Sequence, residues 1–185
     1  MTKNLILSAA ACLPLFLFSQ SVRKPLISSY SSFGAYSVKQ ADLFSATHNQ
    51  ASLCRVKSLT AGMLAERRFM LSELSFYKMA LALPVPGGGI EVNTVYAGSF
   101  SLHEMNTGLA FARSLGKKMD IGIQFNYYGL KTAGYGKAGA VTAEAGALFH
   151  LTDKLTAGMH LYNPFRSLIG KSGEERLAAV YTVGM

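Results

Sequence analysis

The chain has 185 residues, enough for one domain with a sizeable hydrophobic core. Half of it is hydrophobic (50%) and only 15% is charged, against about 25% in ordinary soluble domains. After residue 20 no apolar run is long enough for a membrane-spanning helix, which excludes a helical membrane protein for the mature chain. The formal net charge is +8, but the basic residues fall mostly in predicted turns and no nucleic-acid-binding signature accompanies them, so no nucleic-acid partner is expected.

Residues 1–19 have the pattern of a signal peptide. Lys3 gives a positive start, residues 5–18 are apolar, and polar residues follow, so cleavage is expected near the end of this segment. A lipoprotein cleavage box at Cys12 is the alternative, but the apolar run continues past it. Removal of the signal leaves Cys54 as the only cysteine, which excludes an internal disulfide and indicates a small structural hydrophobe.

Residues 20–54 are expected to form an N-terminal lead-in followed by a short helix. Their first part is rich in serine, and residues 35–53 lack the two-residue alternation of a strand. Leu43 or Phe44 and the neighbouring apolar residues fit a helix that Asn49 and Gln50 would end. Such a segment is a candidate plug or periplasmic cap for the domain that follows.

From residue 55 onward the apolar and polar residues alternate, which predicts strands. Residues 55–185 are therefore expected to form one β domain. The predicted strands are 55–65, 70–83, 89–98, 103–115, 119–130, 140–151, 155–163 and 175–185. In the second strand the apolar positions change parity, which predicts a bulge near Tyr77–Lys78.

Two predicted hairpins resemble each other in sequence, "LGKKMDIG" at 115–122 and "LTDKLTAG" at 151–158. Three-residue loops at 116–118 and 152–154 would keep the flanking apolar residues on one face. The expected cross-strand pairs are Leu115–Met119, Phe111–Ile123, Leu151–Leu155, Phe149–Ala157 and Glu144–Tyr162.

The predicted strands have one apolar face and one small or polar face. In 119–130 the odd positions carry Ile121 and Ile123, and the even positions carry Gln124 and Asn126. The strands are long enough to cross a bilayer at the usual tilt, and the apolar face is almost free of charge. We therefore predict an all-β fold, an antiparallel up-and-down transmembrane β-barrel with a short N-terminal helical segment. It is either a small barrel or part of a larger one.

Short turns alternate with long loops, as in outer-membrane barrels. If the first strand starts from the periplasm, loops 131–139 and 164–174 lie outside the cell, and turns 116–118 and 152–154 face the periplasm.

No sequence motif predicts catalysis. Residues 134–139 match G-x-G-x-x-G, but an amphipathic strand precedes them and a strand is expected after them, so a loop is predicted rather than a dinucleotide site. The histidines lack metal-ligand spacing, and no cofactor or metal is expected. The candidate interior polar residues are Glu66, Glu91, Asn106, Gln124, Asn126, Glu144 and His160.

The segment "SSFGAYSVKQADLFSATHNQASL", followed by a glycine-containing strand and the residues Glu66-Arg67-Arg68-Phe69, resembles the N-terminal region of FadL-like, PorV/PorQ-type outer-membrane proteins. Asp42, Ser45 and 49–53 occupy the places of that family's motif, with Gln50 where the family has proline. The resemblance implies a barrel with its N-terminal segment tucked into or under it. It also implies uptake of hydrophobic compounds or an accessory role in protein secretion.

The sequence therefore predicts an exported, non-enzymatic β-barrel protein of the cell outer membrane. Its expected partners are outer-membrane lipid and either a small hydrophobic molecule or proteins of a secretion system. The rival interpretation is a soluble periplasmic lipid-binding β-barrel or a structural envelope protein, with the apolar face turned inward.

Overall fold

The computed structural model describes residues 34–37, 42–170 and 175–185. The predicted signal peptide lies outside these ranges, so it stays a prediction. The helical turns are η2 Leu43–Thr47, η3 Gln50–Arg55, η4 Arg68–Met70 and η5 Ser72–Leu74. The strands are β1 Thr60–Arg67, β2 Ser75–Val85, β3 Gly88–Gly98, β4 Leu102–Leu115, β5 Met119–Thr132, β6 Gly136–Thr152, β7 Leu155–Tyr162, β8 Leu168–Ile169, β9 Glu175–Arg176 and β10 Val180–Gly184.

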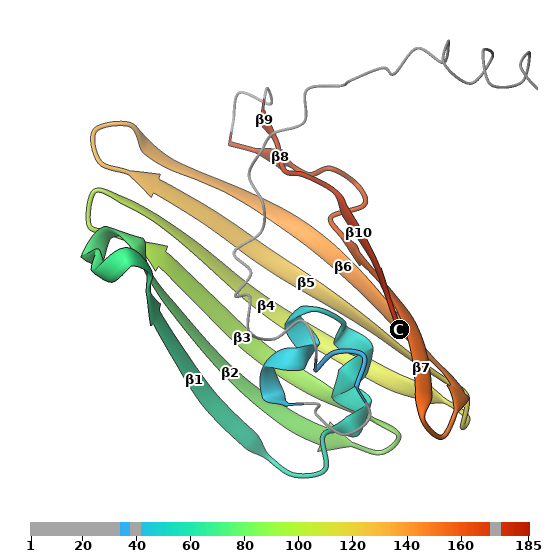
Figure 1. Ribbon diagram of the computed structural model, residues 1–185. Coiled ribbons are helices and arrows are strands. Elements are labelled where there is room, and N and C mark those ends of the chain that lie inside the picture. The colour runs from blue at the N-terminus through green and yellow to red at the C-terminus, as the bar shows by residue number, and fades with distance from the viewer. Residues whose placement is uncertain (1–33, 38–41, 171–174) are drawn as a thin grey trace, which may run out of the picture.

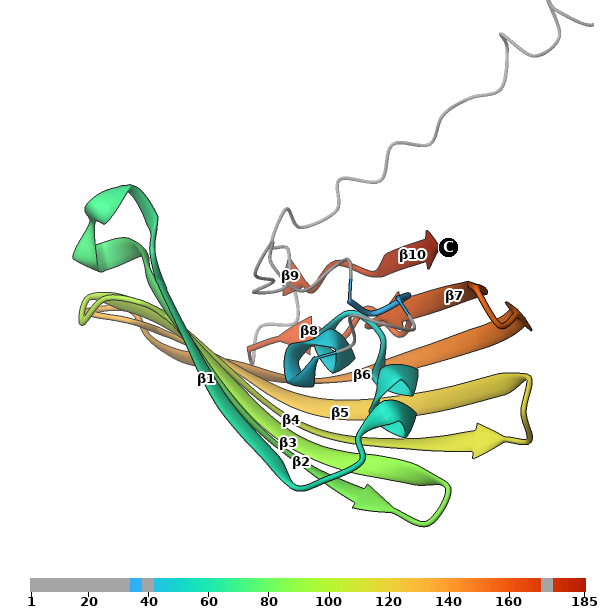
Figure 2. The same ribbon diagram turned by 60° about the horizontal axis from the view of Figure 1, so that its bottom comes forward.

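Eight of these strands form one antiparallel sheet in the order β1-β2-β3-β4-β5-β6-β7-β10, and β8 and β9 form a small separate sheet. The all-β, up-and-down antiparallel prediction is confirmed (Figure 1). The expected closure into a barrel is not seen in the described residues, because β1 and β10 are edge strands that pair on one side only. The sheet is strongly curved, and η2 and η3 lie on its concave side (Figure 2).

The curvature gives the sheet an inner face, toward η2 and η3, and an outer face. Small and polar side chains occupy the inner face, where Ala110 and Ala112 of β4 are fully buried beneath the helical turns. Large apolar side chains occupy the outer face and stay exposed. They include Met63, Tyr77, Met79, Leu81, Leu83, Val92, Met105, Leu109, Phe111, Ile121, Ile123, Phe125, Tyr127, Val141, Phe149 and Met159.

The hairpin between β4 and β5 has the predicted three-residue loop, with Leu115 opposite Met119. The second predicted three-residue loop is wrong. The β-ladder shifts between His150 and Thr152, and Thr152 pairs with Leu155 across a two-residue turn. The Thr152 hydroxyl accepts hydrogen bonds from the backbone N–H of Lys154 at 3.3 Å and of Leu155 at 3.0 Å. This hydroxyl closes a tighter turn than the apolar pattern indicated.

The predicted bulge at Tyr77–Lys78 is also wrong, because β2 pairs without a register shift with both β1 and β3. The change of parity has another cause. Leu74 belongs to the helical turn η5 before the strand, and Phe76 is an apolar side chain buried on the inner face. The first strand also starts later than predicted, at Thr60, because η3 continues to Arg55.

The last predicted strand, 175–185, is two short strands, β9 and β10, of which only β10 joins the main sheet. The loop predicted at 131–139 is much shorter than expected, because β5 continues to Thr132 and β6 begins at Gly136, which leaves only 133–135 as a turn. A strand therefore follows this turn, as predicted. None of the helical turns in the described ranges has the length and apolarity needed to cross a bilayer.

Candidate functional site: the inner face and its helical plug

Residues 42–55 form two 3-10 turns, η2 and η3, which we call the plug. The helix predicted here is confirmed only in part, because Asn49 begins the second turn instead of ending a single helix. Its side-chain oxygen accepts a hydrogen bond from Ala51 N at 3.1 Å, an N-cap that starts η3. The Asn49 amide donates to the carbonyls of Ala147 at 3.2 Å and Met159 at 3.1 Å, which fastens the plug to β6 and β7.

Glycines on the inner face leave room for the plug backbone. A Cβ on Gly122 of β5 would lie 2.5 Å from the carbonyl carbon of Gln50, and one on Gly89 of β3 would lie 2.6 Å from the carbonyl oxygen of Leu53. Real Cβ atoms do not approach backbone this closely, so any larger residue at these positions would push the plug away. Gly89 and Gly122 therefore leave the space that the plug backbone occupies, and we call this part of the inner face the seat of the plug.

Substituting Gly122 by alanine is expected to loosen the plug, because the new methyl group meets backbone that cannot rotate away. Overpacking of this kind costs about 1–3 kcal/mol of stability. Urea unfolding in detergent micelles should show this loss, and hydrogen exchange of residues 42–55 should become faster. Gly129→Ala, on the outer side of the same strand, is the control because its nearest neighbour lies 3.8 Å away. Equal stability and equal hydrogen exchange in the two variants would contradict the close contact between Gly122 and the plug backbone.

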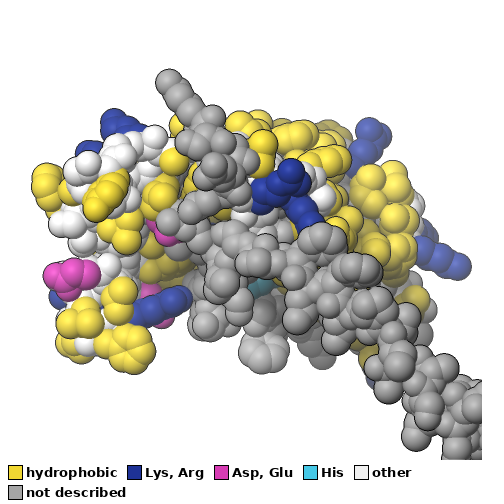
Figure 3. Space-filling model, turned by 90° about the horizontal axis from the view of Figure 1, so that it is seen from above, with side chains coloured by type: hydrophobic (Ala, Val, Ile, Leu, Met, Phe, Trp, Pro, Cys, Tyr) yellow, Lys and Arg dark blue, Asp and Glu magenta, His cyan; other side chains and the backbone are white. Residues whose placement is uncertain are grey.

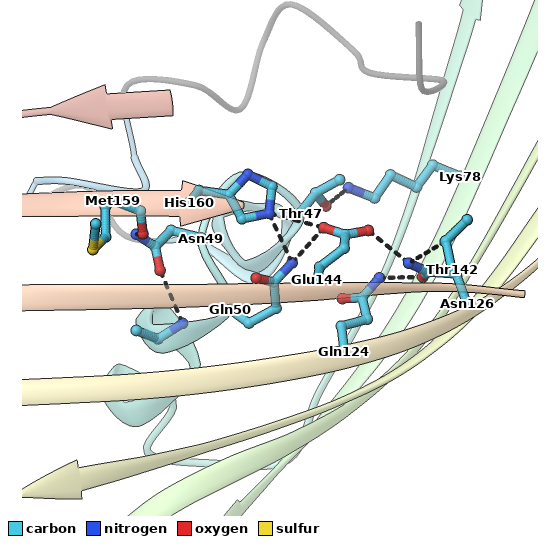
Figure 4. Close-up of polar contacts among 11 residues, drawn as sticks. Thr47, Asn49, Gln50, Lys78, Gln124, Asn126, Thr142, Glu144, Met159 and His160 are labelled. Atoms are coloured by element: carbon cyan, nitrogen blue, oxygen red, sulfur yellow. Dashed lines mark hydrogen bonds and ion pairs between the residues drawn. The ribbon is translucent and has the colours of Figure 1, made fainter. Parts of the chain in front are cut away.

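Glu144 of β6 lies at the centre of a buried polar network (Figure 4). Its Oε1 accepts a hydrogen bond from Asn126 Nδ2 at 2.6 Å. Its Oε2 accepts one from Gln50 Nε2 of the plug at 2.7 Å, and His160 Nε2 of β7 lies 2.9 Å from the same oxygen. These hydrogen bonds offset the cost of burying the carboxylate. Through them Glu144 joins the plug to three strands of the sheet, β5, β6 and β7.

Gln124 and Thr142 extend this network along β5 and β6. Gln124 Nε2 donates to Asn126 Oδ1 at 2.5 Å, and Asn126 Nδ2 lies 3.4 Å from the Thr142 hydroxyl. The predicted register pair Glu144–Tyr162 is confirmed, although the hydrogen bonds of Glu144 described above go to other residues.

Lys78 of β2 makes a second charged contact between the sheet and the plug. It is almost fully buried, donates a hydrogen bond to the hydroxyl of Thr47 in η2, and has its ammonium 4.9 Å from the centre of the Phe44 ring. A buried ammonium needs such partners, because an unpaired charge in a dry site is very costly. Lys78 therefore holds the first turn of the plug as Glu144 holds the second.

A cavity of about 50 Å³ lies between the plug and the wall, which is room for one or two water molecules. Its lining comes from the plug and from β3, β4, β5, β6, β7 and β10. Gln124 Oε1 and Asn106 Oδ1, from two of the lining residues, are buried and have no hydrogen-bond partner among the described residues. Val95 and Val180 also line the cavity, so its surface is largely apolar and carries two acceptors that a small hydrogen-bond donor would satisfy.

Most of the residues predicted to be interior do lie on the inner face. Glu144, Gln124, Asn126 and His160 meet in the network. Asn106 reaches the cavity. Glu91 is fully buried and accepts a hydrogen bond from Asn93 at 2.8 Å.

Glu66 also occupies an inner-face position of the sheet, but it is not buried. It lies at the end of β1, is half-exposed, and pairs with Arg68 at 3.1 Å, apart from the network.

Three residues of this site were not predicted from the sequence: Asn49, Gln50 and Lys78. Asn49 and Gln50 served only as helix-ending residues, and Lys78 was assigned to a bulge. The alternation of β2 could have identified Lys78, since it shares its parity with Ala80 and Ala82 on the inner face. The partners of Asn49 and Gln50 lie about a hundred residues away along the chain, so no local pattern indicates them.

Cys54, the lone cysteine expected to be structural, is half-buried and packs against the small apolar cluster between the plug and the sheet. Burial raises the pKa of its thiol, which lowers the fraction of reactive thiolate at neutral pH. No group of three or more His, Cys, Asp or Glu residues in the described ranges is placed to hold a metal ion.

These features define a class: an all-β protein whose eight-stranded antiparallel sheet exposes an apolar outer face and holds a helical plug against a polar inner face. No protein-family model, curated protein or solved structure matches the chain.

Proposed function

We propose that this chain is a non-enzymatic outer-membrane β-barrel protein whose outer face contacts lipid. The observation that carries the proposal is the arrangement of the two faces. Ile123, Phe125 and Tyr127 of β5 are 48%, 58% and 63% exposed, while Gln124 and Asn126 between them are buried at 3% and 2%. Water-soluble sheets bury their apolar face and expose the polar one, and transmembrane barrels do the reverse.

The same arrangement disfavours the rival proposal of a soluble lipid-binding barrel. Such a barrel needs an apolar interior to receive its ligand. Here the inner face carries carboxylate, amide and imidazole groups around a small cavity, and the large apolar side chains of the outer face point away from it. An exposed apolar surface spread over the main sheet is far larger than the isolated patches found on soluble monomers.

We further propose that the sheet is part of the wall of a barrel with more than eight strands. In lipid every backbone N–H and C=O must be paired, so the free edges of β1 and β10 must gain neighbours. Pairing these two edges with each other would give eight strands, and side chains alone fill a barrel of that size. The plug on the concave side supports a wider barrel.

Within this class, the plug and its polar seat favour a barrel whose interior is blocked by the plug and that acts as an accessory of a protein-secretion system. The cavity of about 50 Å³ is too small for an ordinary hydrophobic ligand. Binding or passage of a small hydrophobic molecule is the second candidate. Its support is that the cavity lies between the plug and the wall, so that displacement of the plug would widen it.

Cell fractionation tests the proposal most cheaply. The full chain, expressed with its own N-terminus in a bacterium with two membranes, is expected in the outer-membrane fraction. It should resist extraction by alkaline carbonate and dissolve only in detergent. Recovery mainly in the soluble periplasmic fraction without detergent would contradict the proposal.

A further inference from the structure

Charged side chains are sorted between the two faces of the main sheet. Every carboxylate in its strands occupies an inner-face position: Glu66, Glu91, Glu104, Asp120 and Glu144. The charged residues at outer-face positions of the same strands are all basic: Arg67, Arg113, Lys131 and Lys137. Wherever the outer face of these strands is charged, it is therefore positive. In the view of Figure 3, basic side chains stand out at both ends and near the middle of the molecule, and acidic side chains are visible at its left.

Two of these basic residues lie directly opposite each other. Lys131 near the end of β5 pairs in register with Lys137 at the start of β6, and both are exposed. Like charges at directly opposed positions of a sheet repel each other, because their Cβ atoms are only about 5 Å apart. Neither lysine forms an ion pair with a carboxylate in the described part of the chain. The pair thus presents two ammonium groups to an anion from outside.

Aromatic rings lie beside this pair of lysines, on the neighbouring strands at the same end of the sheet. His103 of β4 is the register partner of Lys131 and stacks on Tyr96 of β3, with ring centres 5.3 Å apart. Tyr96 in turn packs against Tyr77 of β2 at 6.5 Å. Tyrosines at the margin of an apolar face are typical of the headgroup level of a membrane.

We propose that Lys131 and Lys137 bind the phosphate of an outer-leaflet lipid whose acyl chains lie along the apolar outer face. The proposal rests on the membrane location proposed above and on the orientation in which the β5–β6 turn faces the cell exterior. A phosphate between the two ammonium groups turns their mutual repulsion into attraction, since lysine binds phosphate as a point charge. Phe125 and Tyr127, which lie on the same face of β5 as Lys131, offer the adjoining apolar surface for the chains.

Binding of fluorescent lipid A, whose headgroup carries phosphate monoesters, tests the proposal with the full chain in zwitterionic detergent micelles. The double variant Lys131→Ala/Lys137→Ala is expected to bind about thirty-fold more weakly, because each lysine near an anionic lipid surface contributes about a factor of five. The matched control is Lys117→Ala/Lys118→Ala, in the exposed turn at the opposite end of β5, and it should bind like the unaltered chain.

Competition by inorganic phosphate alone should be weak, since the acyl chains then contribute nothing. Equal loss in both double variants would mean that net charge alone attracts the lipid, and no loss in either would mean that this pair binds none. Both outcomes overturn the proposal. Cell fractionation tests the membrane location separately. If the chain is found in the outer membrane but fails the lipid A test, only the proposed lipid site is contradicted.

Discussion

Replacing Ile123 by arginine is expected to cost about 2–4 kcal/mol of folding stability in lipid vesicles. Ile123 lies in the middle of the outer face of β5 and is 48% exposed. If that face meets the hydrocarbon of a bilayer, the guanidinium loses its water without gaining a partner. If the face met water, a substitution at such an exposed position would change stability by about 0.5 kcal/mol or less. Urea titration of the folded fraction in vesicles measures the difference.

The matched control is Leu115→Arg on the neighbouring strand β4. Leu115 is 50% exposed on the same face, but it is the last residue of its strand, where a long basic side chain can reach the headgroups. Its expected cost is about 0–1 kcal/mol. Equal, small costs for the two variants would indicate that the outer face lies in water.

Removing the carboxylate of Glu144 is expected to be the most damaging change to the interior. Glu144→Ala leaves the amides of Gln50 and Asn126 and the ring of His160 without their acceptor. Each buried donor left unpaired costs about 1–3 kcal/mol, so a total loss of at least about 3 kcal/mol is expected in urea unfolding. The plug should also exchange its amide hydrogens faster, because Gln50 loses its bond to the wall.

Two further variants test whether the loss of stability comes from this network or from the removal of any carboxylate. Glu144→Gln keeps one acceptor oxygen and is expected to lose less stability than Glu144→Ala. Glu66→Ala removes a carboxylate that is half-exposed and paired with Arg68, so it should change stability by about 1 kcal/mol or less. A Glu66→Ala variant as unstable as Glu144→Ala would contradict the special position of Glu144.

The strands of the central sheet could be predicted from the sequence because their faces differ in polarity. The predicted strand 103–115 lies at Leu102–Leu115, and 119–130 lies at Met119–Thr132. Alternation is a local property, and a one-residue slip would reverse both faces, so the pairs Phe111–Ile123 and Phe149–Ala157 were also predicted in register. The same pattern identified Gln124 and Glu144 as residues of one face.

The sequence indicated a short helical segment before the strands, but its contacts with the sheet could not be predicted, because they join distant parts of the chain. In the sequence Gly122 and Gly89 are ordinary strand glycines, and only the packed structure shows that each makes room for plug backbone. The tight turn after Thr152 was missed for a chemical reason, since a hydroxyl bond outweighed the apolar alternation. Lys78 was missed because the apolar Leu74 and Phe76 before it suggested a different register.

Depth-dependent quenching of single fluorophores tests the lipid contact of the outer face most directly. The label is attached singly at residues 121, 123, 124 and 126 on a Cys54→Ser background, and the chain is refolded into vesicles that contain a lipid-borne quencher. A lipid-facing outer face predicts strong quenching at 121 and 123, which are exposed, and weak quenching at 124 and 126, which are buried on the inner face. Uniformly weak quenching at all four positions would mean that the apolar face of β5 meets protein or water, and would contradict the proposed place of this chain in the membrane.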